Sequence, residues 1–499
     1  MKTIELRNGV TKKAEWAMAE PVNFDMAQGE HIAIVGRNGA GKSMFTDMIA
    51  GRHPVFPTTV AYHFEGSSHE LVSDNIKYIT FRDTYGGDND RTYFLQQRWN
   101  QMEIDEETPT VGSKLEEAYH MAGNDTPERR ELQRHLYQLF HLEGLLDKYI
   151  ILLSSGELRK FKLASSLFSD PRLLIIDNPF IGLDAGTRDQ LKTLLAALAA
   201  ERQLQLILVL AKSDEIPTFI THVVEVADMH VLPKLTREDF LARRPPFPTR
   251  VLSDEKAQAI ATLPTSATES KTDGKAGDST EVIRFNKVSI RYGARTILKD
   301  LDWTVNRGEH WALSGQNGSG KSTLLSLVCA DNPQSYACDI RLFGKKRGSG
   351  ESIWDIKRHI GYVSPEMHRS YRQDIPAIRI VASGLKDSIG LYVKPGEQEK
   401  ALCRWWMDIF GIAHLAERPF LQMSSGEQRL VLLARAFVKD PDLLILDEPL
   451  HGLDNTNRQM VKDIINAFCQ RSSKTLIIVT HYKEELPEII DHAIYLEKH

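Results

Sequence analysis

The sequence predicts an α/β protein made of two homologous units that follow one another along the chain. Two observations support this fold class. Short apolar runs alternate with longer amphipathic stretches, a pattern that indicates a mostly parallel sheet flanked by helices. A set of motifs also occurs twice in the same order, and each second copy lies about 270 to 280 positions after the first. Each unit would span roughly 220 to 230 residues, enough to bury its own hydrophobic core.

The composition is that of an ordinary globular protein. Apolar residues make up 42% of the 499 residues and charged residues 26%, and the net charge is −5. So small a net charge gives no argument for binding to nucleic acid or to an anionic membrane. The longest apolar run, at 204–211, is too short to span a bilayer, and the first residues lack the apolar segment of a signal peptide. We therefore expect a cytoplasmic protein.

The cysteines indicate the same compartment. They are Cys329, Cys338, Cys403 and Cys469, and they form neither a CxxC pair nor a metal-binding spacing. We expect reduced and mostly buried thiols, as in cytosolic proteins.

A glycine-rich loop in each unit predicts phosphate binding. Both loops fit the pattern G-x-x-x-x-G-K-[ST], follow an apolar run and precede a stretch with helical spacing. The loop of the second unit consists of Gly315, Gln316, Asn317, Gly318, Ser319, Gly320, Lys321, Ser322 and Thr323. The loop of the first unit consists of Gly36, Arg37, Asn38, Gly39, Ala40, Gly41, Lys42 and Ser43. Such loops wrap an anion with backbone N–H groups at the positive end of a helix.

The last residues of each loop have further expected roles. Lys42 and Lys321 would reach the β- and γ-phosphates of a nucleotide. The hydroxyls of Ser43 and Ser322 would bind Mg²⁺. Both loops therefore predict binding of a nucleotide with its magnesium ion.

A helical subdomain is expected between the phosphate loop and a short Ser-Ser-Gly-Glu segment of each unit. The stretches 113–149 and 396–416 have helical spacing. The segments that follow them are Leu153-Ser154-Ser155-Gly156-Glu157 and Met423-Ser424-Ser425-Gly426-Glu427. A serine hydroxyl and backbone N–H groups at a helix start can bind a γ-phosphate.

Two aspartates predict the other half of each magnesium site. Asp177 and Asp447 end the apolar runs 173–176 and 443–446, which predict buried strands. A phosphate-transferring enzyme places a magnesium-binding carboxylate at such a strand end. The alternative for a single Asp is a turn cap, but the repeat of the whole arrangement favours the metal role.

The two units differ at the residue after each aspartate. Glu448 can act as a base that polarises the attacking water, whereas Asn178 cannot take up a proton. The predicted strands at 206–209 and 475–479 lead to a second difference, because His481 aligns with Ala211. A lone histidine is more often a core or surface residue, but this position in the repeat favours contact with the γ-phosphate. The second unit therefore has a candidate base and a candidate γ-phosphate contact that the first unit lacks.

The composition changes between the units. Residues 236–280 contain several prolines and then a stretch rich in Ser, Thr, Gly and charge, which is typical of a linker. We therefore expect domains at 1–235 and 281–499, joined by a flexible connection that lets the two units face each other.

With these motifs in place, the chain resembles the ATP-binding-cassette (ABC) ATPases, as two cassettes fused in one chain. The resemblance covers everything except the linker. In that family the phosphate loop (Walker A), the signature segment, the Asp-Glu pair (Walker B), the D-loop and a switch histidine occur in this order. The D-loops here would be 182–184 and 452–454. The resemblance implies the P-loop NTPase fold, in tandem nucleotide-binding domains that each carry a helical subdomain, and an ATPase that uses ATP and Mg²⁺.

The resemblance also implies that the two cassettes enclose two ATP molecules, each between the Walker A of one unit and the signature of the other. The complete site would consist of Lys321, Ser322, Asp447, Glu448 and His481 with Ser154, Ser155, Gly156 and Glu157. The other site would consist of Lys42, Ser43 and Asp177 with Ser424, Ser425, Gly426 and Glu427, and it has Asn178 and Ala211 where the base and the histidine belong. We therefore predict that both units bind ATP and that only the second hydrolyses it well. Tyr292 is the expected adenine-stacking residue.

Two motifs depart from the family pattern. The signature reads Ser-Ser-Gly-Glu where the family has Ser-Gly-Gly-Gln. The Q-loop glutamine, expected after Gly361-Tyr362-Val363, is replaced by Ser364-Pro365-Glu366, which makes Glu366 the candidate substitute as an oxygen ligand.

Three functions are compatible with such a chain. It resembles the fused ATP-binding proteins of molybdate transport, which implies separately encoded membrane permease subunits and a place on the cytoplasmic face of the inner membrane. A soluble translation factor on the ribosome is the alternative, although the proline-containing linker and the single Glu argue against it. A DNA-repair ATPase is a third possibility, but no basic stripe with interleaved aromatic residues gives a nucleic-acid signal.

Overall fold

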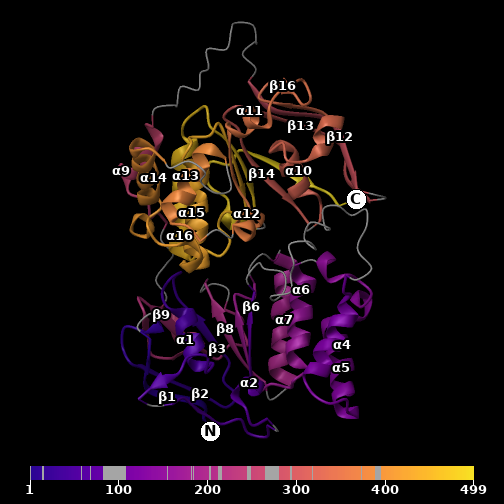
Figure 1. The fold of residues 1–499 in the computed structure, drawn as a ribbon, viewed down its shortest axis with the longest axis vertical. Coiled ribbons are helices and arrows are strands. Elements are labelled where there is room, and N and C mark those ends of the chain that lie inside the picture. The colour runs from indigo at the N-terminus through magenta and orange to yellow at the C-terminus, as the bar shows by residue number, and fades with distance from the viewer. Residues whose placement is uncertain are drawn as a thin grey trace. The chain divides into compact units, whose positions relative to one another are not determined.

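The computed structural model consists of two compact units, Met1–Pro246 and Phe247–His499, each of which is described by itself (Figure 1). Both units are α/β, as the sequence predicts. The structure describes residues 2–13, 16–57, 59–67, 69–81, 108–153, 155–180, 183, 185–201, 204–211, 216–243, 249–263, 280–292, 295–316, 318–371, 374–387, 395–480 and 482–498.

Unit 1 contains an antiparallel sheet and a mostly parallel one. The antiparallel sheet consists of β1 (Lys2–Thr11) and its partners β2 (Val22–Ala27), β4 (Val55–Phe56) and β5 (Ala61–Tyr62). The second sheet has the order β10-β9-β3-β8-β7-β6, with β11 paired to β9. Its strands are β3 (Ile32–Val35), β6 (Ile76–Thr80), β7 (Leu173–Asp177), β8 (Gln205–Leu210), β9 (His222–Ala227), β10 (His230–Val231) and β11 (Leu235–Thr236).

The parallel sheet of unit 1 lies between two hydrophobic clusters. All residues of β3 and β8 are buried, because apart from Gln205 the sequence is apolar on both faces of these strands. Side chains alternate between the faces of a strand. Accordingly, Ala33 and Val35 join the cluster on one face, while Ile32 and Ile34 join the cluster that contains Phe45. The predicted strands at 173–176 and 206–209 are confirmed as parts of β7 and β8.

Helices complete unit 1. They are α1 (Lys42–Ile49), α2 (Val72–Asn75), α4 (Val111–Met121), α5 (Pro127–Phe140), α6 (Ser155–Leu167) and α7 (Ala185–Glu201), with the 3₁₀ turns η2 (Glu143–Leu145) and η3 (Ile150–Leu152). The side chains of Thr110 and Thr126 accept hydrogen bonds from the first turns of α4 and α5 and so cap them. These two helices pack on α6 and form the expected helical subdomain (Figure 1).

Unit 2 repeats both sheets. The antiparallel sheet has the order β13-β12-β15-β16 and consists of β12 (Glu281–Tyr292), β13 (Arg295–Asn306), β15 (Asp339–Leu342) and β16 (Lys345–Lys346). The parallel sheet has the order β17-β18-β19-β14-β20. Its strands are β14 (His310–Gly315), β17 (Ile360–Val363), β18 (Leu443–Asp447), β19 (Thr475–Val479) and β20 (His492–Leu496). The predicted strands at 443–446 and 475–479 are confirmed.

Helices again cover the parallel sheet of unit 2. They are α10 (Lys321–Val328), α11 (Ile353–Lys357), α12 (Pro365–Ser370), α13 (Ala377–Ser383), α14 (Glu397–Ile409), α15 (Ser425–Phe437) and α16 (Asn455–Cys469). Leu444 and Leu446 of β18 pack in the cluster with α15, whereas Leu443 and Ile445 pack in the cluster with α10. β18 is thereby packed on both faces.

The range expected to be a linker, 236–280, contains two helices. α8 (Arg237–Arg243) packs on β11 and β9, and α9 (Asp254–Ala261) packs on α16. Leu252 is buried in the core of unit 2, and its backbone N–H donates to the Asp463 carboxylate at 3.0 Å. Over these residues the structure differs from the expected flexible connection, because a few buried apolar side chains anchor a segment whose composition is mostly polar.

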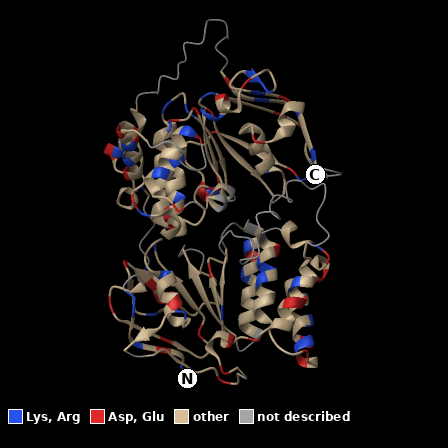
Figure 2. Ribbon diagram, in the orientation of Figure 1, with Lys and Arg blue, Asp and Glu red and all other residues tan. Residues whose placement is uncertain are grey.

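Surface charge and hydropathy agree with the composition. Acidic and basic residues are interspersed over both units (Figure 2). Within the described parts of the chain, none of the helices combines the length and the apolar character required to cross a bilayer.

The cysteines are free thiols, as expected. Cys329, Cys403 and Cys469 are buried. Burial raises the pKa of Cys403 to about 12 and raises the pKa of Cys329 and Cys469 as well. Thiols of this kind are poor nucleophiles, which fits a packing role.

Candidate functional site

Both phosphate loops have backbone conformations that favour glycine. The positive φ angles are 154°, 78° and 102° at Gly36, Gly39 and Gly41, and 151°, 80° and 94° at Gly315, Gly318 and Gly320. A Cβ atom at Gly36 would lie 2.1 Å from the carbonyl oxygen of Val226, and one at Gly315 would lie 2.6 Å from that of Leu496. The loops therefore need glycine both for their turns and for their close approach to the neighbouring strand.

The lysine that begins each following helix turns back onto its loop. Lys42 Nζ donates to the carbonyl oxygens of Gly36 and Arg37 at 2.7 and 2.9 Å. Lys321 makes the same two bonds to the first two residues of its loop, at 2.7 and 3.0 Å. Each ammonium group thus lies within a cradle of backbone at a helix start, where a phosphate would find positive charge and N–H donors.

The parallel register brings the two aspartates to the carboxyl ends of the strands, where the phosphate loops begin. One row across β3, β8 and β7 consists of Ile34, Val209 and Asp177. The corresponding row across β14, β19 and β18 consists of Leu313, Val479 and Asp447. The exposed residues Ser43 and Ser322 stand in the first turn of the helix after each loop. Hydroxyl and carboxylate oxygens are ligands of the kind that Mg²⁺ prefers, so this donor set fits the metal.

The residues after the two aspartates occupy the same backbone position. Asn178 and Glu448 have φ angles of 52° and 49°. Their N–H groups donate to the carbonyl oxygens of Val209 and Val479 at 2.9 and 2.8 Å. Val209 and Val479 are therefore equivalent positions. Ala211 is the second residue after Val209, and in the sequence of unit 2 the second residue after Val479 is His481.

The side chains at this position make different contacts. In unit 1, Asn178 Nδ2 donates to Asp177 Oδ1 at 2.9 Å, and the Tyr78 hydroxyl reaches Asp177 Oδ2 at 3.4 Å. In unit 2, Glu448 Oε2 lies 2.8 Å from His451 Nδ1. The Asn178 amide of unit 1 therefore bonds to its own metal-site carboxylate, whereas the Glu448 carboxylate of unit 2 bonds to an imidazole.

Sequence reasoning missed two residues that hold Glu448, namely Arg429 and His451. Arg429 is 2% exposed, and its guanidinium donates to the carbonyl oxygens of Asp447 at 3.0 Å, of Glu448, and of Pro449 at 3.4 Å. A signal for Arg429 exists, because an arginine also occupies the third position after the glycine of the first signature segment. No such signal exists for His451, because the sequence of unit 1 has no histidine at the corresponding position.

The second signature segment forms a capped helix start. Ser424 Oγ accepts from the N–H of Glu427 at 3.3 Å, and Glu427 Oε2 accepts from the N–H of Ser424 at 2.7 Å. This is a capping box, in which Glu and Gln serve equally, and it explains why the departure from the family pattern leaves the helix start intact. In unit 1, Glu157 pairs with Lys148 at 2.8 Å.

The remaining predicted residues are placed as follows. Tyr292 ends β12, is half-buried, and its hydroxyl accepts from Asn332 Nδ2 at 3.0 Å. Outside the described residues lie Asn317, Ser154, His481 and the D-loop residues Gly182 and Asp184. The side chains of Ser155 and Glu366 are also outside the description.

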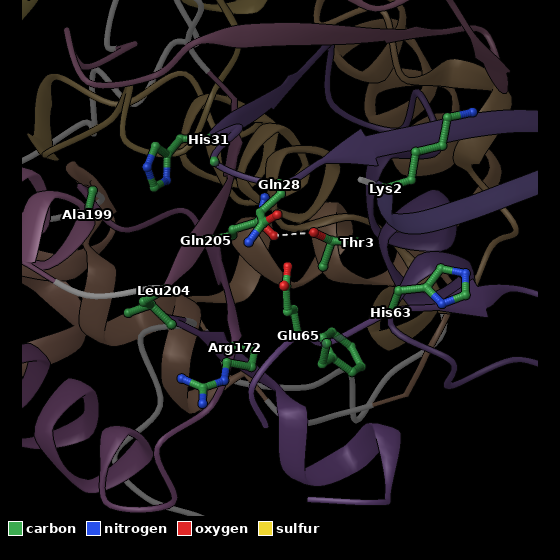
Figure 3. Close-up of a pocket in the computed structure, with 12 residues that line it drawn as sticks. Lys2, Thr3, Gln28, His31, His63, Glu65, Arg172, Ala199, Leu204 and Gln205 are labelled. Atoms are coloured by element: carbon green, nitrogen blue, oxygen red, sulfur yellow. Dashed lines mark hydrogen bonds between the residues drawn. The ribbon is translucent and has the colours of Figure 1, made fainter. Parts of the chain in front are cut away.

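A cavity of about 300 Å³ in unit 1 belongs to the other end of the parallel sheet (Figure 3). It is lined by His31 and Gln205, which precede or begin β3 and β8, and by Thr3, whose hydroxyl bonds to the Gln205 side chain. The phosphate loop leaves from the opposite end of β3. This cavity is therefore separate from the phosphate loop.

Comparison with known proteins places these motifs in a family. A family model described as ABC transporter matches residues 19–181 and 298–451. The chain is 36% identical to "ABC transporter ATP-binding protein ModF" of Escherichia coli strain K12, over 99% of this chain and 96% of that one. It is 30% identical to an uncharacterised ABC transporter ATP-binding protein of Schizosaccharomyces pombe, over 99% of this chain and 98% of that one.

Solved structures share the fold at low sequence identity. One is entitled "Model of ribosome-bound archaeal Pelota and ABCE1" and matches with a TM-score of 0.58 at 17% identity, over 94% of this chain and 72% of that one. Another, entitled "RNase-L Inhibitor", matches with a TM-score of 0.52 at 17% identity, over 94% and 83%. These likenesses show the tandem α/β fold alone.

Proposed function

Because the chain belongs to the ABC transporter family of ATP-binding proteins, we propose that its two cassettes differ in catalytic capacity. The chain is an ATPase with two nucleotide-binding units. In the proposal, unit 2 hydrolyses ATP, whereas unit 1 binds ATP and hydrolyses it slowly. Unit 1 would then act as a structural or regulatory clamp.

The observation that carries this proposal is the substitution at one shared backbone position. Glu448 presents a carboxylate that can accept a proton from the attacking water. Asn178 has the same φ and the same backbone hydrogen bond, but its amide cannot take up a proton. Ala211 also lacks a side chain that could contact the γ-phosphate where the sequence of unit 2 has His481.

The nucleotide would be held by the phosphate loops. Lys321 and Lys42 would contact the β- and γ-phosphates, and Tyr292 would stack on the adenine in unit 2. Bound Mg²⁺, held by Ser322 with Asp447 or by Ser43 with Asp177, would neutralise phosphate charge.

Each site would be completed by the signature segment of the other unit, with the cassettes paired within one chain. The site of unit 2 would receive Ser154, Ser155 and Gly156. The site of unit 1 would receive Ser424, Ser425 and Gly426, whose helix start is already capped and therefore ordered for an anion.

The nucleotide state of the protein tests this asymmetry. The protein is loaded with labelled ATP and Mg²⁺, quenched after about one turnover, and its bound nucleotide is analysed, since single-turnover conditions separate chemistry from binding. We expect roughly half of the bound nucleotide to remain ATP. Complete conversion to ADP would show that both units hydrolyse, and would overturn the proposal.

In the cell we propose that the chain is the ATP-binding subunit of a transport system with separately encoded membrane permeases. The similarity to a protein named as an ABC transporter ATP-binding protein supports this role. Molybdate is the proposed cargo on the resemblance alone, because the cassettes would contact nucleotide and not cargo.

A trapped complex tests the partner. Glu448→Gln protein is incubated with ATP in a lysate that contains membranes and ribosomes, and the captured partners are identified. Recovery of a permease together with its binding protein is the expected result. Recovery of ribosomes or of DNA in its place would assign the chain to translation or to DNA repair.

A further inference from the structure

A histidine contacts the expected catalytic base of unit 2. His451 Nδ1 lies 2.8 Å from Glu448 Oε2. The His451 side chain is 10% exposed and that of Glu448 is 21% exposed, so the contact is largely shielded from water. An ionised carboxylate has no hydrogen to give, and therefore Nδ1 of the imidazole carries the hydrogen of this bond.

The backbone holds the two side chains in this relation. The N–H of His451 donates to the carbonyl oxygen of Glu448 at 3.1 Å and closes a turn. Arg429, from α15, binds the carbonyl oxygens at the start of the same turn. Because the backbone on either side of Glu448 is fixed, the remaining freedom lies in the Glu448 side chain itself, and His451 restricts that freedom.

The environment of His451 indicates that the bond to Glu448 is the main polar role of this side chain. His451 Nε2 is buried and makes no hydrogen bond to any described residue. A histidine kept only for its polarity would expose this nitrogen to water or pair it. The one polar interaction that the described residues give this imidazole is the bond to Glu448.

We propose that His451 is a positioning residue for ATP hydrolysis in unit 2, which holds Glu448 Oε2 so that Oε1 is presented to the attacking water. The proton of the water passes to Glu448, and His451 keeps its own hydrogen throughout. This inference rests on the proposed role of Glu448 as the base.

The contrast with unit 1 supports the assignment. The position that corresponds to His451 is Ile181 in the sequence of unit 1. The neighbouring Asn178 directs its amide to Asp177. Unit 1 therefore lacks the base and the residue that would orient it, as expected if the two act together.

Four variants test the proposal, and three of them change only position 451. His451→Asn places an amide N–H where Nδ1 stands, whereas His451→Gln places it near the position of Nε2, and His451→Ala removes both. We expect kcat to fall about tenfold for His451→Ala and His451→Gln with KM for ATP unchanged within about twofold, because misplaced catalytic groups lower kcat. His451→Asn should keep at least about half of kcat, since its amide can orient the carboxylate.

The fourth variant combines His451→Ala with Glu448→Gln. We expect the double variant to turn over no more slowly than Glu448→Gln alone, because residues that act as a unit are not additive. An unchanged or increased kcat for His451→Ala would overturn the proposal, as would equal losses for Asn, Gln and Ala together with lowered unfolding temperatures. If Glu448→Gln itself keeps its turnover, the proposed base is wrong, and this outcome is visible without any His451 variant.

Discussion

The turn after β7 and the turn after β18 share a backbone and differ in their chemistry. Both follow a buried strand, both have a residue at φ near 50°, and both bond to the neighbouring strand at the same point. In unit 1 that residue is an amide bonded to Asp177, and in unit 2 it is a carboxylate bonded to His451. Under the proposed function, the catalytic difference between the cassettes therefore lies in a few side chains placed on a common turn.

The largest expected effect comes from removing the carboxylate. Glu448→Gln should lower steady-state phosphate release by about 100-fold or more, since general-base catalysis contributes about 10²–10⁴. ATP binding, measured by equilibrium dialysis, should persist. The matched control is Asn178→Gln, which should leave turnover within about twofold. Comparable losses in both variants would remove the asymmetry between the units.

The next largest effects are expected from the lysines of the two phosphate loops. Lys321→Ala should lower turnover by about tenfold or more, because its ammonium would stabilise charge on the transferred phosphoryl group. Lys42→Ala should weaken ATP binding at unit 1 but lower turnover by less than about threefold. Phosphate release and bound-nucleotide stoichiometry measure the two effects. A larger loss of turnover in Lys42→Ala would make unit 1 the main hydrolytic site.

Arg429 tests whether the turn of unit 2 depends on a buried cation. Arg429→Leu should destabilise unit 2 by about 3 kcal/mol, since several buried carbonyl oxygens lose their donor. Calorimetry should show a fall of about 6–12 °C in the unfolding temperature of that unit. Arg429→Lys keeps the positive charge but loses the planar guanidinium, so its unfolding temperature should lie between those of the unchanged protein and Arg429→Leu. An unchanged unfolding temperature for Arg429→Leu would mean that the Arg429 hydrogen bonds do not stabilise the turn after β18.

Replacing the amide of unit 1 gives a smaller effect. Asn178→Glu should destabilise unit 1 by about 1 kcal/mol, because a left-handed backbone suits Asn better than Glu. Turnover should not rise, since Ala211 still stands in place of a histidine. Asn178→Asp, which tolerates this backbone, serves as the control for unfolding temperature. A gain in turnover would show that Asn178 alone silences unit 1.

The smallest expected effect is an acid sensitivity of unit 1. Burial lowers the pKa of His31 below its usual value of 6.5, and its Nδ1 accepts a hydrogen bond from the Leu206 N–H at 3.2 Å. The unfolded chain therefore binds this proton more readily, so the contribution to stability is present above pH 6.5 and is lost as the pH falls through the folded-state pKa. Thermal unfolding between pH 7.5 and 5.5 should show a smaller loss in His31→Gln than in the unchanged protein. An equal dependence of the unfolding temperature on pH in both proteins would contradict a contribution from His31.

Much of the fold and of the site follows from local patterns. The runs that end at Asp177 and Asp447 are apolar at each position before the aspartate, and such short runs favour a strand buried on both faces. The glycine pattern specifies the loops because the backbone angles there favour glycine.

The rest depends on tertiary contacts. Arg429 reaches the end of β18 from another element, and His451 acts through a turn whose shape does not appear in its own sequence. α9 lies in a range of mostly polar composition and was missed, although Ser253 caps it and acidic residues follow in its first turn.

The left-handed turn at Asn178 and Glu448 also has a conformational cost that differs between the units. A backbone at φ near 50° suits Asn better than Glu, so Glu448 has a conformation that its residue type disfavours. Such strain persists only where the surrounding structure holds it, and in unit 2 the Val479 carbonyl and Arg429 hold the backbone of this turn. Under the proposed function, the turn with the catalytic carboxylate is therefore the less stable of the two, and the turn without it has the residue that its backbone prefers.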